Sequence, residues 1–212
     1  MSSHKRIAAF FVTVGLLYAL VLIPWPGVMT AYRTAFCACG NAVFHTFATH
    51  GRVRFEPLPG RNEGKDIQLT LGNVKAPGAR GILEVDSRLM GYLPTGFLVA
   101  LVLATPISWP RRTWALFGGL LLISGFVALK LSLQLLNVYS NKDVLAIYDF
   151  GPFWKAAFTM VLKVLAMSPV TAYIAPVFIW IVLVFRGDDL KPLAGLTASP
   201  ITPKRKEPAA RR

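Results

Sequence analysis

The chain has 212 residues, of which 54% are hydrophobic and 16% are charged, and its formal net charge is +13. Such a high apolar content, bunched into long runs, is typical of a protein that crosses a membrane several times. The basic residues flank these runs or gather in the C-terminal tail, which indicates membrane topology and contact with anionic lipid and argues against a nucleic-acid-binding face. Two cysteines are too few for a disulfide-based fold.

Residues 1–28 are predicted to hold the first membrane helix. Lys5 and Arg6 precede an apolar run that ends at Trp25. A cleaved signal peptide would end in a small-x-small site, whereas prolines surround Trp25, and tryptophan is common at membrane interfaces. We therefore expect an uncleaved transmembrane anchor.

Residues 29–91 are expected to form an extracytoplasmic segment with an amphipathic helix and a small sheet. Apolar positions in residues 29–50 recur at roughly helical spacing, and Gly51 is expected to end that helix. In residues 52–88, apolar and polar positions alternate between turn residues, which predicts about three short strands. So short a segment buries little surface by itself, and it should rest on the membrane helices or on a partner.

Residues 92–136 are predicted to form a transmembrane hairpin. The two helices are expected at residues 92–109 and 113–136, with Pro110 ending the first helix and Arg111 and Arg112 in water. Each helix approaches the roughly 20 apolar residues that cross a bilayer core of about 30 Å. Backbone polar groups in lipid must be paired internally, which favours helices.

Residues 137–185 are expected to contain an outer loop, an interfacial helix at 152–167 and a last transmembrane helix at 169–185. The basic, proline-rich residues 186–212 are expected to be a disordered cytoplasmic tail near anionic lipid.

Basic residues near the ends of spans favour the cytoplasm, so both termini and the Arg111–Arg112 turn are expected inside. The predicted fold class is a mainly α membrane protein with four transmembrane helices and a small extracytoplasmic β segment. Its expected location is a bacterial inner membrane.

A series of short motifs runs through the hairpin, and their order is informative. They are Leu89-Met90-Gly91, Ala104-Thr105-Pro106, the basic turn from Trp109 to Arg112, Gly118-Gly119 and the Val127–Lys130 segment. In this order they resemble the Cys-x-Gly, Ala-x-Pro, basic-turn, Gly-rich and Asn-x-x-Arg elements of exosortases and archaeosortases. Those proteins are membrane cysteine transpeptidases that process C-terminal sorting signals. The resemblance covers about 55 of the 212 residues.

Two departures from that pattern bear on activity. Leu89 stands at the position of the nucleophilic cysteine and has no group that can form an acyl intermediate. Lys130 stands at the position of the arginine and keeps the charge but not the planar fork of donors. The resemblance therefore implies a non-catalytic partner or subunit of an exosortase-type sorting system. Two other hypotheses stay open: a divergent membrane transpeptidase or hydrolase, and a structural or transport-complex subunit.

The candidate nucleophiles and metal ligands have simpler interpretations. Cys37 and Cys39 lie on different faces of the expected helix, and His45 and His50 are poorly phased with them, so we expect helix packing rather than redox chemistry or a metal. Ser87 is expected to cap the helix that follows it. The sequence predicts no catalytic residue, cofactor or metal.

Lys130, Arg88 and Asp86 are the candidate partner contacts. An ionisable residue within a membrane helix is by default a functional hypothesis, with Asp86 and Glu84 as the nearest acidic candidates. The alternative for Lys130 is a boundary charge whose side chain reaches the lipid headgroups. Arg88 is expected to anchor the start of the hairpin.

Overall fold

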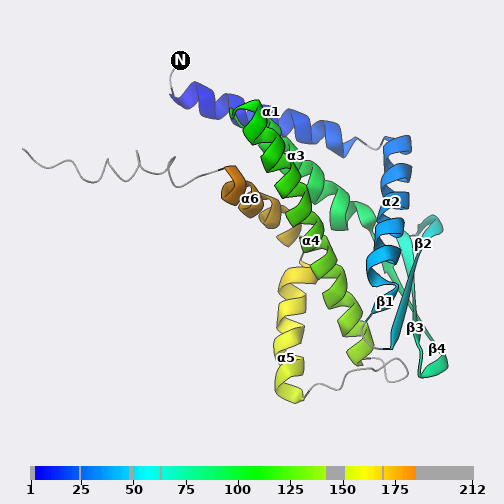
Figure 1. Ribbon diagram of the computed structural model, residues 1–212. Helices are drawn as coiled ribbons and strands as arrows, with labels where there is room; N and C mark the ends of the chain where they lie inside the picture. The colour runs from blue at the N-terminus through cyan, green and yellow to red at the C-terminus, as the bar shows by residue number, and fades with distance from the viewer. Residues whose placement is uncertain are drawn as a thin grey trace, which may run out of the picture.

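The computed structural model describes residues 3–23, 25–47, 50–62, 64–141, 151–168 and 170–184 (Figure 1). The chain is mainly helical and carries a small antiparallel sheet, as predicted. Its elements in chain order are α1 (Ser3–Leu22), α2 (Pro26–Phe44), β1 (Thr46–Phe47), β2 (Gly51–Asn62), β3 (Lys65–Asn73), β4 (Ala76–Val85), the π-helical turn η1 (Arg88–Tyr92), α3 (Leu93–Ala104), α4 (Trp109–Asn141), α5 (Pro152–Val161), the π-helical turn η2 (Leu162–Met167) and α6 (Thr171–Val184).

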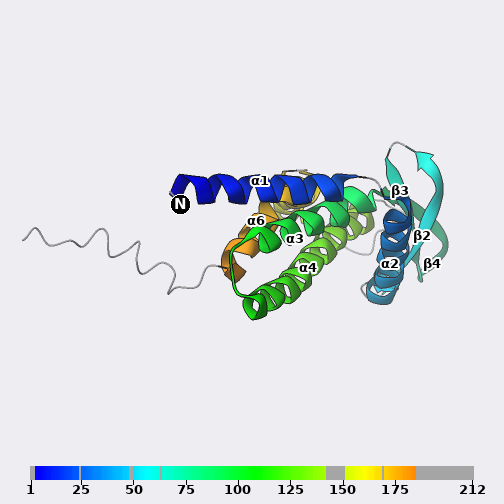
Figure 2. The same ribbon diagram turned by 90° about the horizontal axis from the view of Figure 1, so that it is seen from above.

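Helices α1, α3, α4 and α6 pack together in a bundle, with α3 against each of the other three (Figure 2). Apolar side chains fill the space between these helices, and large apolar side chains also cover the outside of the bundle. A bundle that is apolar on both sides is suited to lipid rather than to water. The inner residues include Leu98, Val102, Ala115, Ile123 and Val184, and the outer ones include Phe11, Leu16, Phe117, Leu121 and Phe178, each of which exposes between 64% and 69% of its surface.

One helix in the described part of the chain, at Trp109–Ser140, is by itself long and apolar enough to cross a membrane. Two pairs of helices reach the required length only together, and each pair is bent. The axes of α1 and α2 differ by 81°, and those of the α5–η2 segment and α6 differ by 76°. The segment Arg88–Ala104 is apolar but shorter.

The hairpin forms with different helix boundaries from those expected. Helix α3 ends at Ala104, where Thr105 turns to extended backbone and Pro106 follows, so the first helix is shorter than expected. Pro110 does not end a helix but lies in the first turn of α4, where a missing backbone N–H costs nothing. Helix α4 also continues beyond Leu136 to Asn141.

The sheet has the order β1-β2-β3-β4 with antiparallel neighbours, so it contains four strands rather than three. The extra strand, β1, arises because Thr46 and Phe47 pair with Arg52 and Gly51 instead of extending the preceding helix, which ends at Phe44 and not at Gly51. Gly64 has a φ of 84° in the turn between β2 and β3, a conformation that glycine adopts at little cost.

The predicted alternation along the strands is confirmed by burial. Val53, Phe55, Ile67, Leu69 and Leu71 are each at most 2% exposed, whereas the residues between them face outward or are half-buried. This apolar face is covered by α2 and by the last turns of α4, which contribute Cys37, Phe44, Leu131, Leu135 and Tyr139 to the same core. The sheet therefore rests on the helices, as its small size requires.

Two polar side chains fasten these helices to the sheet. The Asn41 amide donates to the Phe55 carbonyl at 3.0 Å and accepts from the Phe55 N–H at 2.8 Å, which satisfies the outer edge of β2. The Tyr139 hydroxyl lies 3.0 Å from the Arg52 oxygen and 3.1 Å from the Gly72 oxygen and donates to this pair of carbonyls.

The sheet and α2 lie at one end of the bundle, and both ends of the described chain lie at the other (Figures 1 and 2). The basic turn is at that second end too, because the Arg111 guanidinium donates to the Val184 carbonyl. Helices do form in the two regions expected to hold an interfacial helix and a last span: α5 and η2 occupy the first region and α6 the second. Residues 142–150 and the tail, 186–212, lie outside the described residues.

Candidate functional site

The segment Asp86-Ser87-Arg88 joins the sheet to the bundle. Asp86 Oδ1 accepts hydrogen bonds from the backbone N–H groups of Arg88 at 2.8 Å and Leu89 at 3.1 Å. These bonds cap the start of η1, because the first N–H groups of a helix have no partner within it. The cap is thus Asp86 and not Ser87, which corrects the expectation from the sequence.

Ser87 is instead locked to the sheet. Its backbone N–H donates to Asp66 Oδ1 at 2.8 Å and its hydroxyl donates to Asp66 Oδ2 at 2.6 Å. Only 2% of Ser87 is exposed. His50 lies beside the opposite end of β3, where its carbonyl accepts a hydrogen bond from the Val74 N–H. At roughly 3.3 Å per residue along β3, this end is about 23 Å from Asp66 and Ser87. A Ser-His hydrolytic pair does not form between these residues.

The cysteines are separated as the helical spacing predicts. Cys37 is buried in the core under the sheet, and Cys39 is exposed. Burial raises the pKa of the Cys37 thiol, the opposite of what a thiolate nucleophile requires. Within the described part of the chain, no three His, Cys, Asp or Glu side chains are close enough together to hold a metal ion.

A cavity of about 580 Å³ lies where β4, η1, α4, η2 and α6 meet, and we call it the Lys130 pocket. Its walls are mainly apolar. Leu89 and Lys130 both line it, as expected for the outer ends of two antiparallel helices. Glu84, Asp86 and Gln134 add polar groups to the same cavity.

Lys130 is the unusual side chain of this pocket. It is only 5% exposed, so protein covers it, although a boundary lysine reaching for headgroups would be exposed. Its Nζ lies 5.9 Å from the centre of the Phe126 ring. Among the residues that the structure describes, no carboxylate forms an ion pair with it; Glu84 pairs with Lys65 at 3.6 Å instead. A buried cation that lacks a direct ion pair is costly and is stabilised by an anionic group that enters the pocket and pairs with it.

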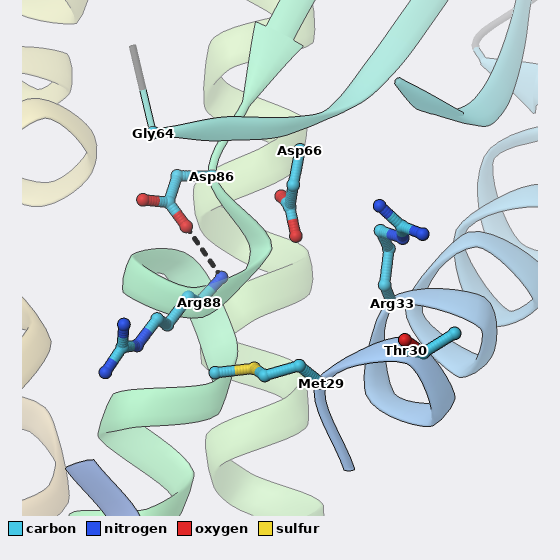
Figure 3. A pocket seen from close by; sticks show the side chains of 7 residues that line it. All are labelled: Met29, Thr30, Arg33, Gly64, Asp66, Asp86 and Arg88. Carbon is cyan, nitrogen blue, oxygen red and sulfur yellow. Dashed lines mark hydrogen bonds between the residues drawn. The ribbon is translucent and has the colours of Figure 1, made fainter. Parts of the chain in front are cut away.

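A second, smaller cavity of about 310 Å³ lies on the other side of the segment from Asp86 to Arg88, and we call it the Arg33 pocket (Figure 3). Arg33 comes from α2, Asp66 from β3, and Asp86 and Arg88 from the junction. The Arg88 guanidinium donates to the Leu22 carbonyl at 2.7 Å, which ties the end of α1 to the start of η1 as an anchor would. Burial raises the pKa of Asp86, and the two amide hydrogen bonds offset only part of this effect.

Sequence reasoning named Asp86, Arg88 and Lys130 but missed Arg33 and Asp66. Both are charged residues in segments that read only as an amphipathic helix and a strand. They meet the junction through the tertiary fold, and no local pattern marks them. Comparisons with protein-family models, with curated proteins and with solved structures find no match to this chain.

Proposed function

We propose that this protein is a non-catalytic membrane subunit of an exosortase-type protein-sorting system. The observation that carries the proposal is that Leu89 and Lys130 line one cavity. These are the positions that correspond to the nucleophile and the arginine in the resembled family. The arrangement keeps one positive charge, while Leu89 offers no nucleophile.

The proposed setting is an inner membrane crossed by α1, α3, α4 and α6. The apolar exterior of the bundle supports this arrangement. So does the position of both described chain ends and the Arg111–Arg112 turn at one end of the bundle, which matches a cytoplasmic side rich in basic residues. The sheet and α2 are then extracytoplasmic. The tail supplies positive charge for anionic lipid on the inner side.

The proposed contact is between Lys130 and a carboxylate of the partner membrane protein. Leu89 exposes 56% of its surface at the same pocket and offers an apolar surface for that partner. Asp86 and Glu84 line the same pocket and repel additional negative charge. They therefore favour a partner surface that brings a single carboxylate to Lys130. A carboxylate that pairs with a desolvated lysine forms a strong charge-assisted hydrogen bond.

Co-purification of substituted chains with the exosortase-type peptidase of the same cell tests this proposal. We expect Lys130→Leu to lose the complex and Lys130→Arg to retain most of it, because only the first removes the positive charge. Lys163→Leu is the matched control, since Lys163 is exposed on η2. Thermal unfolding of each purified variant separates a lost contact from a lost fold. Retention of the complex by a folded Lys130→Leu variant would contradict the proposal. Co-purification with transport or structural proteins alone would favour the alternative of a transport or structural subunit.

A further inference from the structure

The Arg33 pocket is lined by two positive and two negative side chains that do not neutralise one another directly. Arg33 and Arg88 supply the positive charges, and Asp66 and Asp86 supply the negative ones (Figure 3). Within the described residues, no ion pair of 4.0 Å or less joins any of the four. Charged side chains that share a cavity without pairing keep part of their hydrogen-bonding capacity for a ligand.

Hydrogen bonds to the protein's own backbone and to Ser87 hold these side chains in place. Asp66 is fixed by Ser87, Asp86 by two backbone N–H groups, and Arg88 by the Leu22 carbonyl. The Arg88 Nε is buried and has no hydrogen-bond partner in the described structure. The second carboxylate oxygen of Asp86, Oδ2, lies beside the turn at Gly64, where an added Cβ would be 3.7 Å from this oxygen. Arg33 and Asp86, which both line the pocket, thus give it a donor and an acceptor.

Exposed apolar side chains lie next to this pocket along the chain. Leu22, Ile23, Trp25 and Val28 lie in the bend between α1 and α2, directly before the pocket residues Met29 and Thr30, and each exposes between 40% and 50% of its surface. The Trp25 indole N–H is satisfied by the Leu20 carbonyl at 3.2 Å. A polar pocket beside exposed apolar and tryptophan side chains matches the headgroup level of a bilayer.

We propose that the Arg33 pocket binds the headgroup of a zwitterionic phospholipid with a primary ammonium, such as phosphatidylethanolamine. The phosphate is held by the guanidinium group of Arg33, which suits its geometry, while Arg88 points to the other side of the pocket and stays bound to the Leu22 carbonyl (Figure 3). The ammonium faces Asp86 and Asp66, and the acyl chains lie along the apolar bend. A purely anionic headgroup meets two carboxylates in the same cavity, and a quaternary ammonium cannot donate the hydrogen bonds that Asp86 Oδ2 accepts. Lys130 does not line this pocket, so the inference rests on the proposed membrane setting but not on the proposed sorting partner.

Lipid retention by the purified full-length chain tests this site. The delipidated protein is exchanged into mixed micelles that contain phosphatidylethanolamine, phosphatidylcholine or phosphatidylglycerol with identical acyl chains, and bound lipid is counted by native mass spectrometry. We expect phosphatidylethanolamine to be retained about tenfold better than the other two, the effect of one charge-assisted hydrogen bond. Equal retention of the three lipids, or a preference for phosphatidylglycerol, would overturn the site.

Two substitutions refine the test. Arg33→Gln should reduce phosphatidylethanolamine retention, while Arg80→Gln, at an exposed position of β4, should not. Asp86→Asn keeps an oxygen that caps η1 but removes the negative charge, so it should reduce the preference for phosphatidylethanolamine over phosphatidylglycerol. If Arg33→Gln retains as much lipid as Arg80→Gln, the bound lipid lies elsewhere. The wild-type comparison decides the question even where a variant fails to fold.

Discussion

At the residue scale, Gly91 of the Leu89-Met90-Gly91 motif allows close packing between η1 and α2. A Cβ at Gly91 would collide with the Tyr32 hydroxyl oxygen of α2, while the Tyr32 ring carbon that carries it is 3.4 Å away. The Tyr32 ring also meets Tyr92 edge-on at 5.3 Å. Glycine at this position therefore lets α2 lie against η1, and so places Arg33 beside the junction.

We expect Gly91→Ala to destabilise the protein by about 1–3 kcal/mol, because the added methyl group overpacks this contact. Tyr32→Phe removes the oxygen that would be struck, so the double variant should recover much of the loss. Thermal unfolding of the two single variants and the double variant measures this coupling. Strictly additive effects would show that the collision is relieved by movement elsewhere.

The carboxyl group of Asp86 leads to a second prediction, which concerns how the stability of the protein depends on pH. Burial raises its pKa, so the folded state binds the proton more tightly than the unfolded state does. Stability from this group is then greatest below the unfolded pKa of about 3.9 and falls as pH rises through the folded pKa. Asp86→Asn removes the buried charge and keeps the cap, and we expect it to raise the unfolding temperature of the delipidated protein near pH 7 but not near about pH 3.5. An equal change at both values would contradict this assignment.

At the scale of elements, the attachment of α2 to β2 depends on one side chain. Asn41 pairs with both backbone groups of Phe55 on an edge of β2 that none of the described strands covers at that point. We expect Asn41→Ala to cost about 1–3 kcal/mol, the penalty for leaving partly buried polar groups unsatisfied. Thr34→Ala, at an exposed position of the same helix, is the control in thermal or denaturant unfolding. Similar losses in the two variants would mean that water satisfies Phe55 equally well.

The elements that the sequence predicted correctly are those governed by local patterns. Alternation at Val53 and Phe55 and the long apolar run of α4 depend only on neighbouring residues. The ends of α2 and α4 were placed wrongly because tertiary contacts decide them. Thr46 and Phe47 pair with β2, and Tyr139 reaches the sheet, so one helix is shorter and the other longer than its own sequence indicates.

The candidate site, like the fold, was predictable only where local helix geometry decides which residues meet. Leu89 and Lys130 flank one hairpin, so helix geometry alone brings them to one cavity. Arg33 and Asp66 join the junction from a distant helix and strand, and Ser87 binds Asp66 instead of capping a helix. Such pairings depend on how the sheet is placed on the bundle, which no sequence spacing encodes.

At the scale of the whole molecule, the proposal fixes which end faces the cytoplasm. The turn that contains Lys75 lies with the sheet, and Arg112 lies at the opposite end of the bundle, where its guanidinium contacts Thr105 and Trp109. We expect a membrane-impermeant thiol reagent to label a cysteine at position 75 in intact cells and one at position 112 only after permeabilisation. A Cys39→Ala background removes the exposed native thiol. The reverse labelling pattern would invert the topology.

The central claim is that the Lys130 pocket receives a carboxylate of a sorting peptidase, and photo-crosslinking at Leu89 tests it most directly. A photoreactive side chain at this exposed position of the pocket should crosslink to the exosortase-type peptidase in intact membranes. The crosslink should disappear when the Lys130→Leu substitution is added and persist when the Lys163→Leu substitution is added instead. Crosslinks to lipid alone, or a peptidase crosslink that survives Lys130→Leu in a folded protein, would contradict the account.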